Sequence, residues 1–238
     1  MATAALTIGT KMMTTRMTDV SDCLPLLESW LRTRARCTPR PFGTASGRYQ
    51  GFSDDARGVQ WNTGIDRQRG VVTVGVNLEG MKYDNWPIAT FLLQERVRPD
   101  LPGVLRQSAG ADRLEVWLER DCWQAAARLP ISESFIGPEP PLAVSRLSDP
   151  YWADMIARAL ECLDASRAYR GRGRQEVTLL RSGKVEKDVS PHLQVKYVLP
   201  SASVSIVALE TAALALEPVY AYIRARCNDE RIAAGRRS

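Results

Sequence analysis

The spacing of apolar and polar residues changes along the chain between a period of two and a period of three to four, which predicts strands mixed with helices. A two-residue period over Val59–Asp66 and Val71–Glu79, joined by residues 67–70, predicts an antiparallel hairpin. A turn centred there pairs Trp61 with Val76, Thr63 with Val74, Ile65 with Val72, Gln60 with Asn77, and Asn62 with Gly75. One face of the hairpin is then mostly apolar and the other polar.

A second hairpin is predicted from Glu176–Arg181 and Lys184–Leu199, with its turn at Ser182-Gly183. The second of these strands alternates, so that one face is apolar and the other polar. Its polar positions are Ser190, His192, Gln194 and Lys196, and its apolar positions are Leu193, Val195 and Tyr197. Pro191 should interrupt the hydrogen-bond ladder or mark an edge or a bulge.

Helical spacing predicts four helices and leaves a short strand and two irregular stretches between them. The first helix is capped by Ser21 and runs to about Arg34, with Pro25 in its first turn, and the second is capped by Asp84 or Asn85, with Pro87 near its start. The third helix runs from a Ser148 cap to about Ala165. The last runs from about Ser203 to Leu216, and Pro218 kinks or stops it before a shorter continuation over Tyr220–Cys227. The strand covers Leu114–Glu119, and residues 38–58 and 129–147 read as irregular connections.

These elements predict the α+β class, with a central mixed or mainly antiparallel sheet built from hairpins and flanked by helices. The chain of 238 residues is long enough for one large domain. We expect a single globular domain over residues 18–227, a disordered leader over 1–17 and a frayed tail over 228–238.

The net charge and the cysteine content exclude few classes of function. The net charge of +5 is compatible with a polyanionic partner. The five cysteines are scattered without a CxxC pair, and a single histidine leaves no zinc site of the usual spacing, so free thiols in a cytoplasmic protein are expected. The most apolar stretch, Val204–Leu216, is interrupted by Glu210 and is interpreted as a core helix. Trp117 and Trp123 could stack on bases, but we interpret both as core residues.

Four arginines lie close together between the third helix and the second hairpin. They are Arg167, Arg170, Arg172 and Arg174, and they alternate with Tyr169, Gly171 and Gly173. Guanidinium groups bind phosphate oxygens with two hydrogen bonds, and glycines let a backbone approach closely. The segment is therefore a predicted nucleic-acid-binding loop, with a solvated connection as the alternative.

The segment Gln194-Val195-Lys196 resembles the acid-x-Lys end of the PD-(D/E)xK motif of Type II restriction endonucleases, with glutamine in the place of the acid. The resemblance implies Mg²⁺ held by acidic groups and a lysine that helps to activate water. It places Gln194 and Lys196 in the site, and it leaves the remaining acid open among Glu176, Glu186 and Asp188. We take Glu176 as a catalytic residue and Glu176 with Asp188 as metal ligands.

His192 is a candidate general base or phosphate-orienting residue, because its ordinary pKa lies near neutrality. An alternative catalytic set is Asp66, Glu79 and Lys82, with Glu-x-x-Lys spacing. Phosphate-binding glycine motifs of the GxGxxG and GxxxxGK[ST] types are absent from the sequence, so nucleotide-cofactor chemistry has no support.

The leading prediction is a DNA-binding, Mg²⁺-dependent endonuclease that acts on double-stranded DNA and resembles a restriction enzyme. Such an enzyme is expected to be a homodimer, since a palindromic site matches a two-fold protein. One alternative is a nucleic-acid-binding protein without catalysis, and a second is a protein-interaction or ligand-binding module.

Overall fold

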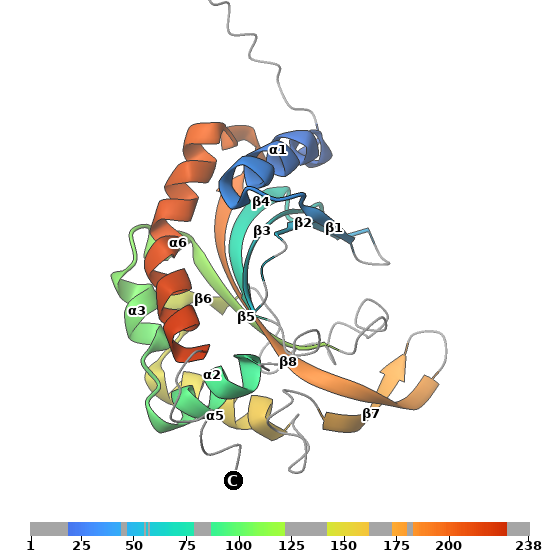
Figure 1. Cartoon of the computed structure of the whole chain (residues 1–238), viewed down its shortest axis with the longest axis vertical. Helices are drawn as coiled ribbons and strands as arrows, with labels where there is room; N and C mark the ends of the chain where they lie inside the picture. The colour runs from blue at the N-terminus through green and yellow to red at the C-terminus, as the bar shows by residue number, and fades with distance from the viewer. Residues whose placement is uncertain are drawn as a thin grey trace, which may run out of the picture.

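A strongly curved antiparallel sheet organises the fold (Figure 1). The computed structural model describes residues 19–43, 47–54, 56, 58–78, 87–121, 142–161, 173–179 and 183–227. Its strands are β1 (Arg40–Gly43), β2 (Tyr49–Ser53), β3 (Val59–Asp66), β4 (Val71–Leu78), β5 (Leu114–Asp121), β6 (Leu142–Ala143), β7 (Gly173–Leu179) and β8 (Gly183–Pro200). They pair in the order β1-β2-β3-β4-β8-β5-β6, and β7 pairs with β8 outside this path.

The β3–β4 hairpin has the register that the sequence predicts. Trp61 lies opposite Val76, and Asn62 lies opposite Gly75. The turn over residues 67–70 ends at Gly70, whose φ of 65° lies in the left-handed region where glycine carries no steric penalty. The predicted two-faced hairpin is therefore confirmed, with β4 ending at Leu78 in the described part of the chain.

The long strand β8 belongs to two parts of the structure. Its first half pairs with β7 around the predicted turn at Gly183, and its second half lies between β4 and β5. Pro191 does not interrupt the strand; it lies opposite Arg120 of β5, just before the pairing with β4 begins at Leu193. The proline therefore lies within the strand, next to the first residue of β8 that pairs with the described part of β4.

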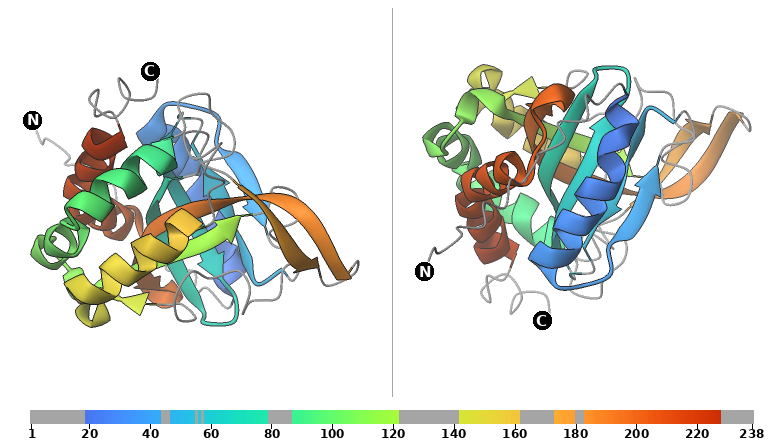
Figure 2. Two further views of the ribbon diagram at one scale, coloured as in Figure 1. Left: turned by 90° about the horizontal axis from the view of Figure 1, so that it is seen from below. Right: turned by 90° about the horizontal axis from the view of Figure 1, so that it is seen from above.

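Helices cover the convex face of the sheet, as Figures 1 and 2 show. They are α1 (Leu24–Ala35), α2 (Pro87–Val97), α3 (Leu101–Gln107), α5 (Asp149–Glu161) and α6 (Ile206–Cys227). Their apolar sides and the convex side of the sheet bury one shared core that extends from Val20 to Ile223. Burial of this kind is the main stabilising term of the fold. The α+β class is confirmed.

Two predicted helix ends differ from the structure. A 3-10 turn, η1 (Val20–Cys23), precedes α1, so Asp19 rather than Ser21 accepts the capping hydrogen bonds. Helix α6 is one helix through Pro218 to Cys227, so the predicted stop at Pro218 does not occur. Proline removes the hydrogen bond to the carbonyl of residue 214, and Leu214 is 67% exposed, so that carbonyl lies on the solvent side of the helix. Ser148 does cap α5, accepting the N–H of Tyr151 at 3.3 Å.

By length and apolar composition, α6 is the one described helix that could cross a bilayer, and 39% of its apolar window is buried inside the fold. Its buried residues, among them Leu209, Leu216 and Val219, pack on the sheet and its neighbouring helices. Glu210 and Glu217, also on α6, both pair with Arg34 of α1. Helix α6 thus has the buried face that the sequence predicts for a core helix.

Candidate binding pocket on the concave face

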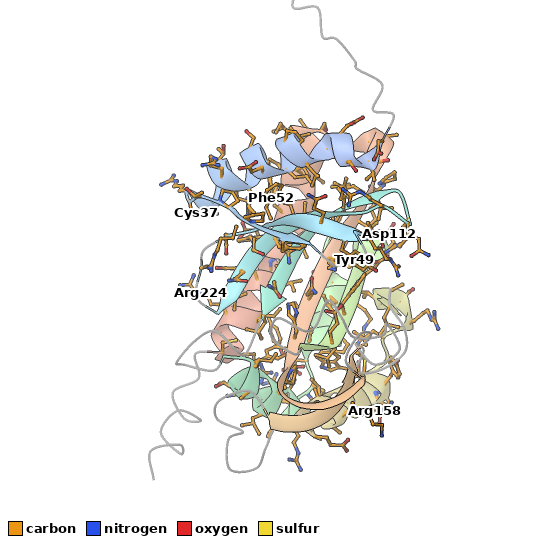
Figure 3. All side chains as sticks on the ribbon, turned by 90° about the vertical axis from the view of Figure 1, so that its right-hand side faces the viewer. Cys37, Tyr49, Phe52, Asp112, Arg158 and Arg224 are labelled. Atoms are coloured by element: carbon orange, nitrogen blue, oxygen red, sulfur yellow. The ribbon has the colours of Figure 1, made fainter. Side chains whose placement is uncertain are left out.

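The face of the sheet opposite the helices carries mostly polar residues. Register places the following residues on it: Tyr49 and Gly51 of β2, Asn62, Gly64 and Asp66 of β3, Thr73, Gly75 and Asn77 of β4, His192, Gln194 and Lys196 of β8, and Glu115, Trp117 and Glu119 of β5. Figure 3 is viewed from this concave side and labels Tyr49 among its side chains. The alternation of β8 predicts this polar face, and the structure shows that four further strands contribute to it.

Two aromatic rings meet across the concave face. Tyr49 of β2 and Trp117 of β5 form an edge-to-face pair with ring centroids 5.5 Å apart and an interplanar angle of 81°. Three strands, β3, β4 and β8, separate β2 from β5 in the sheet. Since flat neighbouring strands lie about 4.8 Å apart, the two rings touch only because the sheet curls. The pair therefore forms one wall of a pocket that lies over the central strands.

Lys196 points into this pocket and its ammonium group lies on the aromatic wall. Its Nζ is 3.5 Å from the centroid of the Trp117 ring and 5.6 Å from that of Tyr49. No described residue forms a hydrogen bond or an ion pair with this Nζ. Burial lowers the pKa of Lys196 to about 8, although the carboxylates of Glu119, Glu115 and Asp66 act in the opposite direction.

Asp66 lies at the other side of the pocket and is 2% exposed. Its Oδ1 accepts the backbone N–H of Gln68 at 3.0 Å and of Arg69 at 3.2 Å, and it lies 3.5 Å from Nε of Arg48. Its Oδ2 is buried and has no hydrogen-bond partner in the described part of the chain. A buried carboxylate oxygen without a donor costs free energy, so it is a place where a ligand donor would be stabilised.

The remaining charges nearest the pocket are already paired. Arg69 donates to Glu115 through both terminal nitrogens, at 2.9 and 2.5 Å, and this pair raises the pKa of Arg69. Bidentate pairs of this kind hold both side chains in fixed positions. The pair thus closes one end of the pocket.

A second polar network occupies the concave face beside the pocket. Gln60 accepts from the Asn77 amide at 3.1 Å, and Asn77 Oδ1 contacts Nε2 of His192. Nδ1 of His192 lies 3.8 Å from Glu119, whose carboxylate also accepts from Gln194 at 3.3 Å. The network connects β3, β4, β8 and β5, and it fixes His192 between an amide and a carboxylate.

The pocket itself is small, with a volume of about 30 Å³. The residues that line it are Phe42, Tyr49, Asn62, Gly64, Ile65, Asp66, Arg69, Thr73, Trp117, Gln194 and Lys196. A space of this size holds one or two waters or a compact polar group, since one water needs roughly 10–15 Å³ by this kind of measure. The pocket is partly open, so a larger molecule would place only one end in it.

The structure groups some of the predicted catalytic residues and separates others. His192, Gln194 and Lys196 lie side by side on the concave face, as predicted. Glu176 lies on β7 opposite Glu186, and the extended strand from Glu186 to Gln194 spans about 26 Å. Asp188 is opposite Arg174 on the same ribbon. The backbone thus does not place Glu176 or Asp188 beside Lys196; Glu115 of β5 lies directly opposite Lys196, and Glu119 accepts a hydrogen bond from Gln194.

The other predicted groups are described only in part. Arg167, Arg170 and Arg172 lie outside the described residues, and Arg174 is described only as a backbone position of β7. In the alternative set, Asp66 lies in the pocket, whereas Glu79 and Lys82 lie outside the described residues. Among the described residues, no three His, Cys, Asp or Glu side chains gather as a metal site.

Neighbouring strands bring to Lys196 several residues that the sequence did not predict there. Tyr49 lay in a stretch interpreted as a loop, and Glu115 and Glu119 belonged to a strand without a predicted neighbour. Trp117 is 3% exposed, but it stands on the polar face and contacts Lys196 rather than the apolar core. In the sequence, Glu115, Trp117 and Glu119 alternate with the apolar residues of β5, and this alternation could have placed the three on the polar face.

Comparison with protein-family models, with curated proteins and with solved structures found no match to this chain. The resemblance to restriction endonucleases therefore stays a prediction.

Proposed function

We propose that the protein is a binding module for a small polar ligand with an anionic group, and that the ligand is held in the concave pocket. The observation that carries this proposal is Lys196, whose ammonium group lies against an aromatic wall without a counter-ion among the described residues. Burying a charge without a partner is costly, and proteins retain such groups mainly at functional sites. An anion on Lys196 would offset that cost.

The other features of the pocket fit the same role. Small-ligand sites are concave, with apolar walls and a few fixed polar groups. Here Tyr49 and Trp117 supply the wall, and the Arg69–Glu115 pair fixes one end. Gly64 also lines the pocket, and a Cβ there would lie 3.4 Å from the ring of Phe42, another lining residue.

Titration of the protein with acetate, propionate and benzoate tests this proposal, with calorimetry and tryptophan fluorescence as readouts. We expect saturable binding that Lys196→Met abolishes. Lys184→Met is the matched control, because Lys184 is an exposed lysine of the same strand. Equal binding by the wild type and Lys196→Met, or no binding of any carboxylate, would refute the proposal.

A metal-dependent phosphodiesterase is a second candidate, and Glu119 is the observation that favours it. Its carboxylate accepts from Gln194 at 3.3 Å, so an acid from β5 lies beside the glutamine that stands where the restriction-endonuclease motif has its acid. Mg²⁺ would be held at Glu119, and Lys196 would stabilise charge on the phosphate. The predicted DNA partner, homodimer and cytoplasmic location belong to this candidate.

Plasmid cleavage in Mg²⁺ separates the two candidates. The nuclease requires nicking that Lys196→Ala and Glu119→Gln both remove. Salt-sensitive DNA binding without cleavage in any divalent metal would instead favour the predicted nucleic-acid-binding protein that uses the arginine segment.

A further inference from the structure

The pocket contains two groups of opposite charge that each keep unused hydrogen-bonding capacity. Nζ of Lys196 carries three N–H donors and contacts only aromatic rings among the described residues. Oδ2 of Asp66 is a buried acceptor without a donor. Both residues line the same pocket, and Asp66 is among the carboxylates that act on Lys196.

The other charges that act on these groups balance one another. Arg69 and Glu115 are joined by two hydrogen bonds, and Arg48 lies 3.5 Å from the satisfied oxygen of Asp66. The charge of Glu119 also affects the pKa values of Lys196 and Tyr49. Asp66, Arg69 and Lys196 line the pocket. Arg48, Glu115 and Glu119 contact lining residues, so three basic and three acidic side chains lie in or next to the pocket in the described part of the chain.

A ligand with one charge would satisfy only half of this arrangement. A simple anion would pair with Lys196 but would leave Oδ2 of Asp66 without a donor and would lie close to three carboxylates. A simple cation would satisfy Asp66 and leave the ammonium group unpaired. A net-neutral ligand with both poles satisfies both groups and leaves the local charge unchanged.

We propose that the pocket recognises a compact zwitterion, a molecule with an anionic group for Lys196 and an ammonium group for Oδ2 of Asp66. This inference rests on the proposed ligand-binding function and names the class of ligand. The small volume admits only the two-pole head of such a molecule, and any further part would extend through the open side. The Trp117 ring covers one side of the Lys196 ammonium group, and a low-dielectric surface of this kind strengthens the contacts of a bound anion.

A series of ω-amino acids of increasing length tests how far apart the sites for the two charged groups, at Lys196 and Asp66, lie. Glycine, β-alanine and γ-aminobutyrate carry the same poles at increasing distance, and acetate and methylamine each carry one pole. We expect one member of the series to bind at least tenfold more tightly than acetate, by calorimetry in a buffer without carboxylates or amines. Acetate binding as tightly as every ω-amino acid would overturn the zwitterion inference and leave the proposed function standing.

Two variants assign the poles. Asp66→Asn keeps an oxygen for the N–H groups of Gln68 and Arg69 and removes the negative charge, so the advantage of the amino acid should disappear while acetate binding remains. Lys196→Met should abolish the binding of both. An unchanged amino-acid preference in Asp66→Asn would overturn the assignment. Failure of acetate and all amino acids to bind the wild type would overturn the proposed function itself.

Discussion

Replacing Lys196 by methionine should stabilise the protein at neutral pH. Methionine is similarly long and unbranched, so it can keep the packing against Trp117 while removing the ammonium group. The wild-type lysine carries its charge into a half-buried pocket, where burial lowers its pKa from 10.5 to about 8. The charged form is therefore less favourable in the folded protein than in the unfolded chain.

The size and the pH dependence of the effect follow from that shift. One pKa unit corresponds to about 1.4 kcal/mol, so the charge destabilises the folded protein by roughly 3 kcal/mol below pH 8. This is an upper figure, because the half-buried side chain keeps some contact with water. Between pH 8 and 10.5 the unfolded chain binds more protons than the folded protein, so wild-type stability gains relative to the variant as pH rises.

Urea unfolding of the wild type and Lys196→Met at pH 7 and pH 10, followed by tryptophan fluorescence, measures the effect. The variant should be more stable at pH 7, and most of its advantage should be gone at pH 10. Other groups also bind or release protons on unfolding in this range. One is Cys227, whose pKa is raised to about 12 by burial in the folded protein; such groups are common to both proteins and cancel in the difference. A variant that is no more stable at pH 7, or whose advantage does not depend on pH, would refute this account of Lys196. Lys184→Met, at an exposed position of the same strand, should show neither effect.

Two further substitutions test the framework of the fold by urea unfolding. Gly51→Ala should destabilise the protein by about 1–3 kcal/mol, because a Cβ there would lie 2.0 Å from the backbone oxygen of Thr63. As the control, Gly103→Ala in α3 places its Cβ in open space and should be neutral or stabilising. Equal effects of the two substitutions would contradict the close approach of β2 and β3 at Gly51. Glu95→Ala removes the acceptor of the buried Trp152 indole N–H at 2.7 Å and should cost about 1–3 kcal/mol, while Glu95→Gln keeps an acceptor and should cost less. Similar losses in the two Glu95 variants would show that this hydrogen bond is not what the side chain contributes.

Local patterns along the sequence predict local structure well in this protein. The β3–β4 register follows from a two-residue period on both sides of a short turn, where only one pairing matches apolar residues with apolar residues. The polar face of β8 follows from its own alternation. The path of α6 through Pro218 was not predictable, because it depends on which side of the helix faces solvent after packing.

The candidate site depends on contacts between distant parts of the chain, and these could not be predicted from the sequence. The neighbours of β8 in its second half are β4 and β5, and neither has a short connection to β8. Lys196 was recognised as a polar residue of interest, but its aromatic neighbour Trp117 was interpreted as core because most buried indoles are. The carboxylate beside Gln194 is that of Glu119 rather than Glu176, and this too could not be predicted, because it depends on the pairing of β5 with β8.

The Tyr49–Trp117 contact has a consequence for how the protein folds. The two residues are far apart in sequence, and their rings meet only after β3, β4 and β8 have assembled between them. Closing such a long loop is slow compared with forming the β3–β4 hairpin. The pocket should thus be among the last parts of the molecule to form. The protein has six tryptophans, so the difference in indole emission between the wild type and Trp117→Phe would report its completion in a refolding experiment.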